Sequence, residues 1–237
     1  MILKTRHLTK RFGGLTAVDE VDFSVLEGEI RCIIGPNGAG KSTFSQLVCG
    51  THKSDSGTIL FNEKDVSRLP AFRRVRLGLG LKFQTNRAYH NLTVSQNLGI
   101  PLREWQWARN PSAEGYFRLA TESFQLEDKG HLPAKQLPHH QLQWLEICVA
   151  LASGPRLLFL DEPTAGMSPE ETHFTAEVVK KLNQMGLTIV AVEHDMTFVR
   201  EIAQTVTVLH QGRVFAEGTM SEISAHDGVK QIYLGSA

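Results

Sequence analysis

Short apolar stretches separated by glycines fill the first part of the chain, and their lengths predict β-strands. Expected strands are residues 2–9, 21–26, 30–34 and 58–61. A helical pattern follows Lys41, with Leu47 and Val48 on its apolar side, and Gly50 lies past its expected end. Residues 78–84 predict another short strand.

The character of the sequence changes to helical between residues 91 and 151, and then alternates again. Strands are expected at 157–160, 188–192 and 205–210, and helices at 170–185 and 196–203. Alternation of this kind predicts an α/β fold with a parallel sheet and crossover helices. We therefore expect one domain, 1–237, with a core from 1–88 and 152–237 and a helical subdomain at 89–151.

Composition narrows the class of protein without naming a function. The chain has 237 residues and a formal net charge of zero, so no long-range attraction to nucleic acid is expected. No apolar run approaches the length of about 20 residues that a membrane span needs, and the N-terminus is no signal peptide. The three cysteines lack metal-site spacing and predict buried, reduced thiols. The basic cluster at 72–76 is expected to be a solvated helix face, with a phosphate-reading surface as the alternative.

A phosphate-binding loop stands out between the expected strand at 30–34 and the helix that follows. The sequence "GPNGAGKST" fits the pattern G-x-x-x-x-G-K-[ST] in its required strand-to-helix context. Glycines let backbone amides surround phosphate oxygens, while the lysine supplies a positive charge and the serine a hydroxyl for Mg²⁺. We expect ATP at Gly35, Asn37, Gly38, Ala39, Gly40, Lys41, Ser42 and Thr43.

Two carboxylates follow the apolar run "LLFL" at 157–160. Asp161 ends the expected strand and is placed to hold Mg²⁺, and Glu162 is placed to orient or deprotonate an attacking water. Paired acids at a strand end can also be merely solvated. Beside a phosphate-binding loop, the catalytic interpretation is favoured.

These motifs, with "KFQ", "LPHHQ", "LLFLDEP" and "VEHDM" in order along the chain, resemble the ATP-binding subunits of ABC transporters over nearly the whole length. The resemblance implies an ABC-type nucleotide-binding domain with an antiparallel N-terminal β subdomain. Further stretches such as "NLTVSQNL", "DEPTAGM" and "GVKQIYLG" are similar to the branched-chain amino acid and urea importer branch. "QWLEI" and "GLGLKFQ" lean toward the urea-type ATPase.

The resemblance also implies roles for residues outside the two phosphate motifs. Phe12 would stack on adenine with Val18 beside it, Gln84 would touch Mg²⁺ and the attacking water, and His194 would contact the γ-phosphate and steady Glu162. Each has a simpler alternative: a sheet aromatic for Phe12, a solvent-facing strand end for Gln84, and a structural imidazole for His194. A histidine at the carboxyl end of a parallel strand favours ligand binding.

The stretch at 137–141 departs from the family pattern. It usually reads LSGGQ and completes the ATP site of a partner cassette, whereas here it reads Leu137, Pro138, His139, His140 and Gln141. Pro138 has no hydroxyl and no N–H, although proline suits a first helical turn. His140 could clash with the phosphate or, if protonated, replace the lost donors with charge. Alternatively, the loop shifts slightly and the site still works.

A second departure lies nearby, because Ser168 stands where the family usually has an aspartate that links the two ATP sites. The resemblance implies that this branch commonly lacks that carboxylate, so the departure bears only on the link between the two sites. In the helical insertion, Trp105 and Trp107 suggest either core packing or a groove wall for a membrane subunit.

The resemblance implies an ATPase, with ATP and Mg²⁺, that powers import of a small polar solute such as urea or a branched-chain amino acid. Expected partners are a second cassette packed head to tail, two membrane permease subunits and, indirectly, an extracytoplasmic solute-binding protein, with no nucleic acid. The expected location is the cytoplasmic face of the inner membrane. Two alternatives stay open: a nucleotide-dependent clamp with weak hydrolysis, favoured by the LPHHQ stretch, and a non-transport ABC ATPase.

Overall fold

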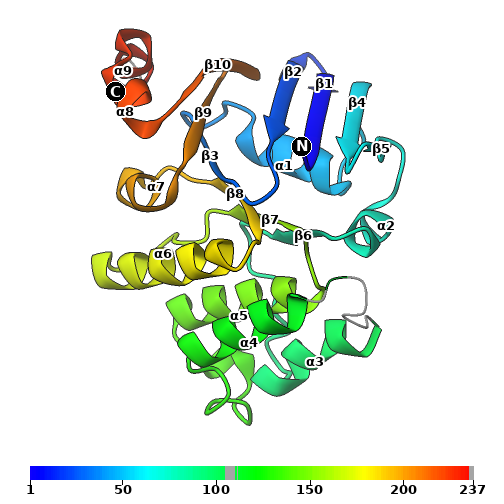
Figure 1. Cartoon of the computed structure of the whole chain (residues 1–237), viewed down its shortest axis with the longest axis vertical. Coiled ribbons are helices and arrows are strands. Elements are labelled where there is room, and N and C mark those ends of the chain that lie inside the picture. Colours follow the sequence, from blue (N-terminus) through cyan, green and yellow to red (C-terminus); the bar gives the residue numbers. More distant parts are fainter. Residues whose placement is uncertain (105–109, 111, 235–237) are drawn as a thin grey trace.

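The computed structural model of the protein describes residues 1–104, 110 and 112–234. Trp105 and Trp107 lie outside the described residues. Figure 1 shows an antiparallel sheet at one end of the molecule, a layer of helices at the other, and the strands of a second sheet between them.

The antiparallel sheet has the strand order β2-β1-β4-β5. Its strands are β1 (Leu3–Phe12), β2 (Leu15–Val25), β4 (Ser56–Phe61) and β5 (Lys64–Asp65). The first two strands are longer than the sequence predicts, because pairing continues from Leu3 opposite Val25 to Phe12 opposite Leu15. Residues at that far end are exposed, so apolar alternation fades while the backbone ladder continues.

The core sheet has the order β10-β9-β3-β8-β7-β6. Its strands are β3 (Ile30–Ile34), β6 (Leu79–Lys82), β7 (Leu157–Asp161), β8 (Thr188–Val192), β9 (Thr205–His210) and β10 (Arg213–Gly218). All neighbours are parallel except β9 and β10. The predicted mostly parallel α/β core with an antiparallel N-terminal sheet is therefore confirmed.

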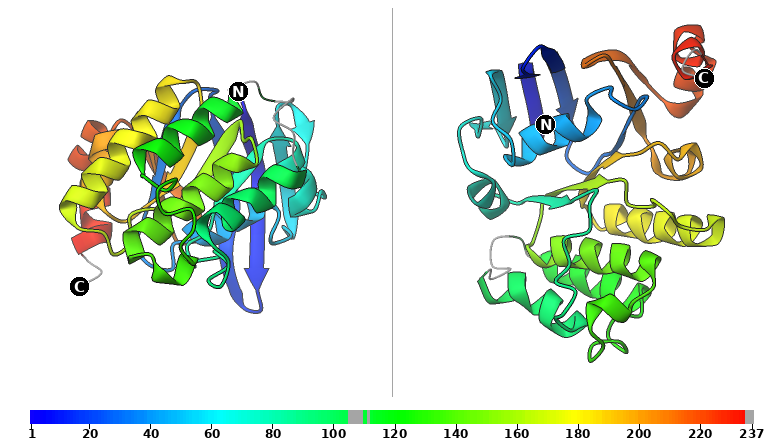
Figure 2. Two further views of the ribbon diagram at one scale, coloured as in Figure 1. Left: turned by 90° about the horizontal axis from the view of Figure 1, so that it is seen from below. Right: turned by 180° about the vertical axis from the view of Figure 1, so that it is seen from behind.

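Helices cover both faces of the core sheet. They are α1 (Lys41–Cys49), α2 (Ala71–Arg76), α3 (Val94–Glu104), α4 (Ala113–Ser123), α5 (His139–Ala152), α6 (Pro169–Gln184), α7 (Met196–Ile202), α8 (Met220–Ala225) and α9 (Asp227–Leu234), with a 3₁₀ turn at Ala134–Gln136. Helices α3, α4 and α5 lie together, and seen from below they stand with α6 in front of the sheet (Figure 2).

The core strands are buried on both faces, which explains their unbroken apolar runs. Alternate residues of one strand belong to different hydrophobic clusters: Leu158 and Leu160 pack toward α5 and α6, whereas Leu157 and Phe159 pack toward α1 and the antiparallel sheet. Because successive side chains of a strand point to opposite faces, the core sheet packs against the helices on one side and against α1 and the antiparallel sheet on the other.

Some elements were not predicted. Strand β10 and helices α8 and α9 are short, and β10 alternates between exposed and half-buried residues, so apolar periodicity gives little signal. Among the described residues, no helix is both long and apolar enough to cross a membrane. The three cysteines are buried and free, as predicted.

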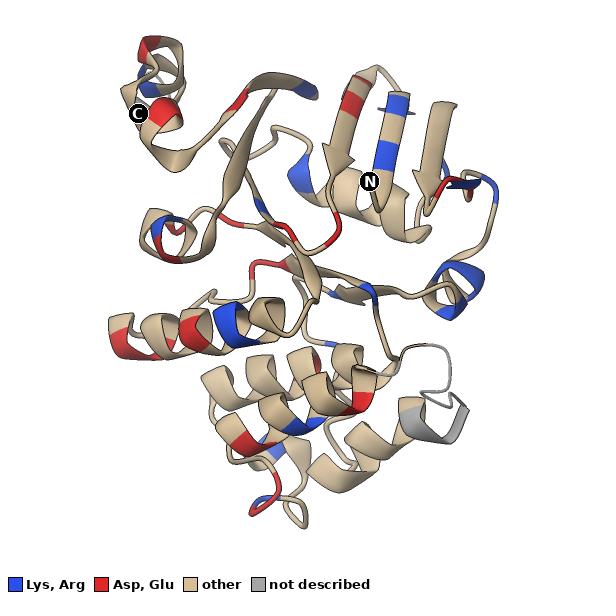
Figure 3. Ribbon diagram, in the orientation of Figure 1, with Lys and Arg blue, Asp and Glu red and all other residues tan. Residues whose placement is uncertain are grey.

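The expectation of a fully solvated basic helix at 72–76 is wrong for Arg74. Its side chain is 2% exposed, and its guanidinium donates to the carbonyl oxygens of Leu47 and Val48 at 2.7 Å each, at the end of α1. Further hydrogen bonds reach the carbonyls of Ser67 and Leu69. A cation at a helix C-terminus satisfies carbonyls that have no partner within the helix. Elsewhere, basic and acidic residues are interspersed over the ribbon (Figure 3).

Candidate active site

The phosphate-binding loop connects the buried strand β3 to the first turn of α1. Two of its glycines permit backbone approaches that no other residue allows. A Cβ on Gly35 would lie 2.2 Å from the carbonyl oxygen of Leu209, and one on Gly40 would lie 2.2 Å from that of Ala17. Both glycines also have positive φ, at 152° and 99°. The loop is thus fitted between β9 and β2.

The rest of the loop divides into a fixed and an open part. Ala39 is buried, and its carbonyl accepts a hydrogen bond from the Gly212 N–H at 3.0 Å. Asn37 and Gly38 are exposed, and Ser42 and Thr43 are half-buried in the first turn of α1. The helix N-terminus and the exposed amides therefore face a region that an anion can enter.

Lys41 folds over this loop. Its Nζ donates to the carbonyl oxygens of Gly35 at 2.6 Å and Pro36 at 3.1 Å, and the side chain is 7% exposed. Burial lowers the pKa of Lys41, and the carboxylates of Glu162 and Asp161 oppose that shift. The ammonium is therefore held at the loop, close to both acids.

Asp161 ends β7 with its side chain 2% exposed. One oxygen, Oδ2, accepts from the Ser45 hydroxyl at 3.3 Å, while the buried Oδ1 has no partner among the described residues. Burial, together with the charge of Glu162, raises the pKa of Asp161 to about 6. A buried carboxylate oxygen without a partner is costly, and it fits a hard cation with oxygen ligands such as Mg²⁺.

Glu162 occupies a strained turn directly after β7, with φ at 47°. Two interactions hold that turn: its N–H donates to the Val192 carbonyl at 2.9 Å, and Lys82 Nζ donates to the carbonyls of Asp161 and Glu162 at 3.2 and 3.3 Å. The Glu162 carboxylate stays partly exposed and lies 3.8 Å from His194 Nδ1. A carboxylate is thus presented toward the phosphate-binding loop, with an imidazole beside it.

Gln84 lies at the same edge of the sheet. It follows β6, in which Lys82 pairs with Leu160 of β7, so the two strands end side by side. Its side chain is exposed. The structure therefore brings Gln84 to the edge where Asp161 and Glu162 stand.

Phe12 and Val18 differ in what they offer to a nucleotide. The Phe12 ring is 44% exposed, with Lys10 Nζ 5.3 Å and the His52 ring 5.9 Å from its centroid. Val18 is 1% exposed and packs in the same cluster as Ala39. Phe12 is exposed enough for a nucleotide to reach it, whereas Val18 in this conformation supports the loop from within the core.

The LPHHQ stretch forms the start of α5. Leu137 is buried, Pro138 precedes the first helical residue, and Gln141 is half-buried with its Oε1 shielded from solvent. Proline at this point needs no N–H donor, which agrees with the sequence argument.

The two histidines of the stretch turn toward their own chain. His139 Nε2 donates to the Ala165 carbonyl at 3.0 Å, and His140 Nδ1 lies 2.7 Å from Glu171 Oε1. The His140 imidazole, which could clash with a neighbour's phosphate or offer it charge, is engaged with Glu171 of α6 in this chain.

Residues 18–165, more than half of the chain, match the family model described as "ABC transporter". The chain belongs to the ABC transporter family of ATP-binding proteins. It is an ABC ATPase with one cassette in the described chain, and the predicted enzyme class is confirmed.

Relatives of this ABC ATPase include proteins of branched-chain amino acid transport. It is 35% identical to the high-affinity branched-chain amino acid transport ATP-binding protein LivG of Salmonella typhimurium, covering 100% of this chain and 98% of the relative. It is 33% identical to a probable LivG of Archaeoglobus fulgidus, with 99% and 96% covered.

Solved cassettes share its fold. An ATP-binding cassette of an ABC transporter in its ADP conformation is 30% identical, with a TM-score of 0.86 over 99% of this chain and 98% of that one. A dimeric cassette bound to ADP and phosphate is 26% identical, with a TM-score of 0.81 over 92% and 99%.

Sequence reasoning missed three polar residues of this cassette's site. Lys82 and Ser45 contact the carbonyls and carboxylate at 161–162, and Glu193 is fully buried between the loops after β7 and β8. Glu193 accepts from the N–H and hydroxyl of Thr164 and from the N–H of His194 at 3.2, 2.8 and 3.1 Å. Burial raises the pKa of Glu193. For Lys82 and Glu193 the signal was a charged residue at the end of an apolar strand, whereas Ser45 lies inside α1 and carries no such signal.

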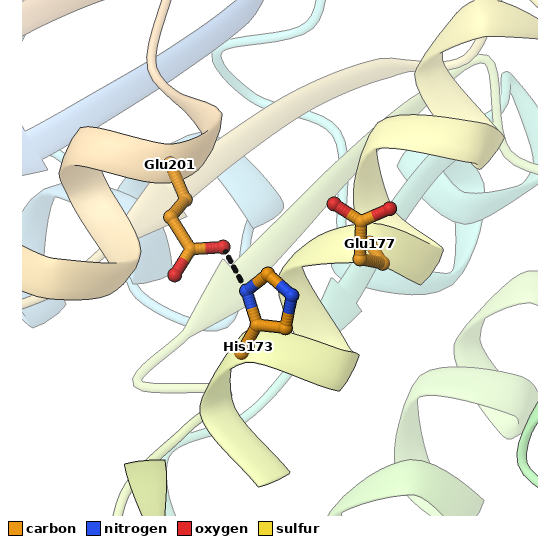
Figure 4. Close-up of side chains that lie close together, drawn as sticks. All are labelled: His173, Glu177 and Glu201. Carbon is orange, nitrogen blue, oxygen red and sulfur yellow. Dashed lines mark hydrogen bonds and ion pairs between the residues drawn. The ribbon is translucent and has the colours of Figure 1, made fainter. Parts of the chain in front are cut away.

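A separate cluster of His173, Glu177 and Glu201 lies on α6 and α7 of the cassette (Figure 4). His173 Nδ1 pairs with Glu201 at 2.8 Å, and Glu177 pairs with Lys180 one turn along α6. The side chains are half-buried or exposed. The His173–Glu201 contact joins the two helices at the surface, whereas the Glu177–Lys180 pair lies within α6.

Proposed function

We propose that this ABC ATPase hydrolyses ATP to power import of a small polar solute of the branched-chain amino acid class. The LivG relatives support that class, and urea or a short amide is the alternative solute. The observation that carries the proposal is the edge at which Lys41, Asp161, Glu162 and His194 meet.

The mechanism assigns one task to each group at this edge. Glu162 polarises a water for in-line attack on the γ-phosphate, and His194 holds that carboxylate and contacts the phosphate. Lys41 releases the carbonyls of Gly35 and Pro36, 2.6 and 3.1 Å away, and places its charge against the phosphate oxygens. Phe12, which is exposed, stacks on the adenine.

Mg²⁺ is proposed at Asp161, Ser42 and Gln84, where the unpartnered Asp161 oxygen gives the strongest support. When bound, the ion neutralises charge on the transferred phosphate. Asp161 must be ionised to hold it, and Ser45 fixes the orientation of that carboxylate through its hydroxyl.

Partners are proposed at two surfaces. Residues 137–141 face a second cassette, packed head to tail, and complete its ATP site. A largely apolar groove between β6, α3 and α5 is lined by residues including Phe83, Ala88, Tyr89, Ile100 and Val149. We assign it to a permease subunit, which would place the ATPase on the cytoplasmic face of the inner membrane and connect it indirectly to an extracytoplasmic binding protein. Phe83 lines the groove and is followed directly by Gln84, so a subunit bound in the groove can change the position of this proposed metal ligand.

Uptake of radiolabelled leucine and urea should be compared in cells of the source organism from which the gene for this protein has been deleted. The cells are complemented with the native protein or with Glu162→Gln. Restored leucine uptake with the native protein alone supports the proposal. Restored urea uptake instead makes urea the solute, and no change in either uptake overturns the transport proposal.

The clamp alternative rests on the LPHHQ stretch, which lacks the serine hydroxyl and glycines that the family uses. A clamp would bind Mg·ATP and release it unchanged. Phosphate production by the purified native chain, absent in Glu162→Gln, excludes the clamp. If the ATPase also failed to co-purify with any membrane protein, a non-transport role would be favoured.

A further inference from the structure

The two histidines at 139 and 140 form a connection that the usual LSGGQ sequence cannot make. We propose that His139 and His140 are positioning residues that tie the start of α5 to the 165–171 segment of the same chain. The inference rests on the proposed function, because α5 then completes a partner's ATP site while the 165–171 segment follows this chain's own catalytic acids.

His139 provides the first link. Its Nε2 lies 3.0 Å from the Ala165 carbonyl oxygen, and since a carbonyl only accepts, Nε2 must carry the proton. The imidazole also packs on Gly166, where a Cβ would lie 3.2 Å from the ring. Gly166 has φ at 73°, so its turn both requires a glycine and leaves room for the imidazole.

His140 provides the second link, through Glu171. Its Nδ1 is 2.7 Å from Glu171 Oε1, while Glu171 Oε2 accepts from the Ser168 N–H at 2.9 Å. In return, the Ser168 hydroxyl accepts from the Glu171 N–H at 3.2 Å, which completes a capping box at the start of α6. One carboxylate therefore connects the LPHHQ stretch to Ser168, the position where the family usually has an aspartate.

A third contact continues the connection along both helices. Trp144, one turn beyond His140, donates from Nε1 to the Thr175 hydroxyl at 2.9 Å. The His140 ring stands edge-on to Trp144 with centroids 4.8 Å apart, and Trp144 stacks on Phe124. Trp144 is 8% exposed, so its contact with Thr175 is fixed in the core. The contacts of His139 and His140 lie nearer to solvent.

These contacts indicate that the LPHHQ sequence has a structural role and is not simply a disabled form of LSGGQ. Glycines at 139 and 140 would have no side chain to reach Ala165 or Glu171. The histidines make the α5 start and the 165–171 segment move together, and they supply a link between the two ATP sites that does not need a carboxylate at 168. We name this arrangement the α5–α6 contact: His139, His140, Ala165, Ser168 and Glu171.

Matched substitutions separate the hydrogen bonds from the bulk of the side chains. His139→Gln and His140→Asn place an amide N–H near the Nε2 and Nδ1 positions, whereas His139→Leu and His140→Leu fill the same space without a donor. Amide hydrogen exchange of residues 163–172 in the full-length chain is the first measurement. The leucine pair should raise the exchange rate about fivefold or more, the equivalent of one lost hydrogen bond, and the amide pair should restore it.

ATP turnover is the second measurement, on the same proteins. The leucine pair should lower kcat about tenfold with little change in KM, because the chain's own phosphate-binding loop is untouched, and the amide pair should recover most of it. Unchanged exchange at 163–172, or turnover equal to or above native in the leucine pair, overturns the inference. Failure of the proposed function looks different: the native chain would release no phosphate, while the exchange result would still decide whether the connection exists.

Discussion

At the carboxyl edge of the core sheet, Asp161, Glu162 and Glu193 stand on the ends of fully buried strands. At the α5–α6 contact, His139 and Glu171 stand in the first turns of helices and remain partly open to solvent. In the first region the backbone fixes where each group lies. In the second, side-chain choice alone makes the connection, so replacing the two histidines can remove their links without disturbing the fold.

Burial also makes the two regions respond differently to charge. Desolvation shifts the pKa values of Lys41, Asp161 and Glu193. Of these groups, Asp161 keeps a buried oxygen without a partner among the described residues, which a bound cation would satisfy. The contact between the helices is satisfied within the protein. Substitutions at the edge should therefore change chemistry most, and substitutions at the contact should change coordination between segments.

The largest effect is expected from Glu162→Gln. Loss of the carboxylate that activates water should lower ATP turnover by about 10²–10⁴-fold, the usual contribution of a general base, while Mg·ATP binding is kept. Phosphate release and nucleotide binding are measured side by side. Glu170→Gln, which changes an exposed acid at the start of α6, serves as the control and should hydrolyse normally. Turnover retained in Glu162→Gln would break the assignment of the base.

Asp161→Asn should lower turnover by about 100-fold and should also remove a pH effect on stability. The pKa of Asp161 is raised to about 6 by burial and by Glu162, so the folded state favours the protonated carboxyl. That stabilisation is complete below the unfolded pKa of about 4 and is lost as the pH rises through about 6.

The nucleotide-free Asp161→Asn variant should consequently unfold at a higher temperature than the native chain at about pH 7, with the difference vanishing near pH 4. In the native protein, Mg²⁺-dependent nucleotide binding should weaken as the pH falls through about 6, because protonation removes the charge that holds the ion. Thermal scans without nucleotide check the first point. A variant less stable than native at neutral pH would contradict it.

Arg74→Met tests the C-terminal end of α1, the helix that follows the phosphate-binding loop, because this end depends on one buried side chain. It removes the guanidinium from the carbonyls of Leu47 and Val48 at the end of α1 and should lower the free energy of unfolding by about 3 kcal/mol. Urea denaturation measures the loss. Arg73→Met, at an exposed position of the same helix, should change stability by less than about 0.5 kcal/mol.

The smallest effect is expected at Ser168. Ser168→Ala removes the N-cap hydroxyl of α6 and should cost about 1 kcal/mol, whereas Ser168→Asp keeps an acceptor there and should cost a few tenths at most. Denaturation of both variants gives the comparison. If Ser168→Asp instead raised turnover markedly, the connection through Glu171 would not be substituting for the family's carboxylate.

Much of the fold followed from local patterns. Buried parallel strands are apolar throughout, so β3, β7, β8 and β9 were predicted close to their observed bounds. The phosphate-binding loop and the acids after β7 were identified because their spacing is local and their backbone needs are strict. The ends of the β1–β2 hairpin were missed because exposed strand residues carry no apolar alternation.

The sequence by itself determined the nucleotide chemistry, since strand, glycine loop, lysine and terminal acids lie within short segments whose geometry is fixed by the backbone. Only the tertiary structure decided which side chains support them. Lys82 reaches carbonyls about eighty positions away, and His140 finds Glu171 on another helix. These partners are far apart in the sequence and become neighbours only when the layers pack together. The spacing of residues within a short segment therefore cannot predict them.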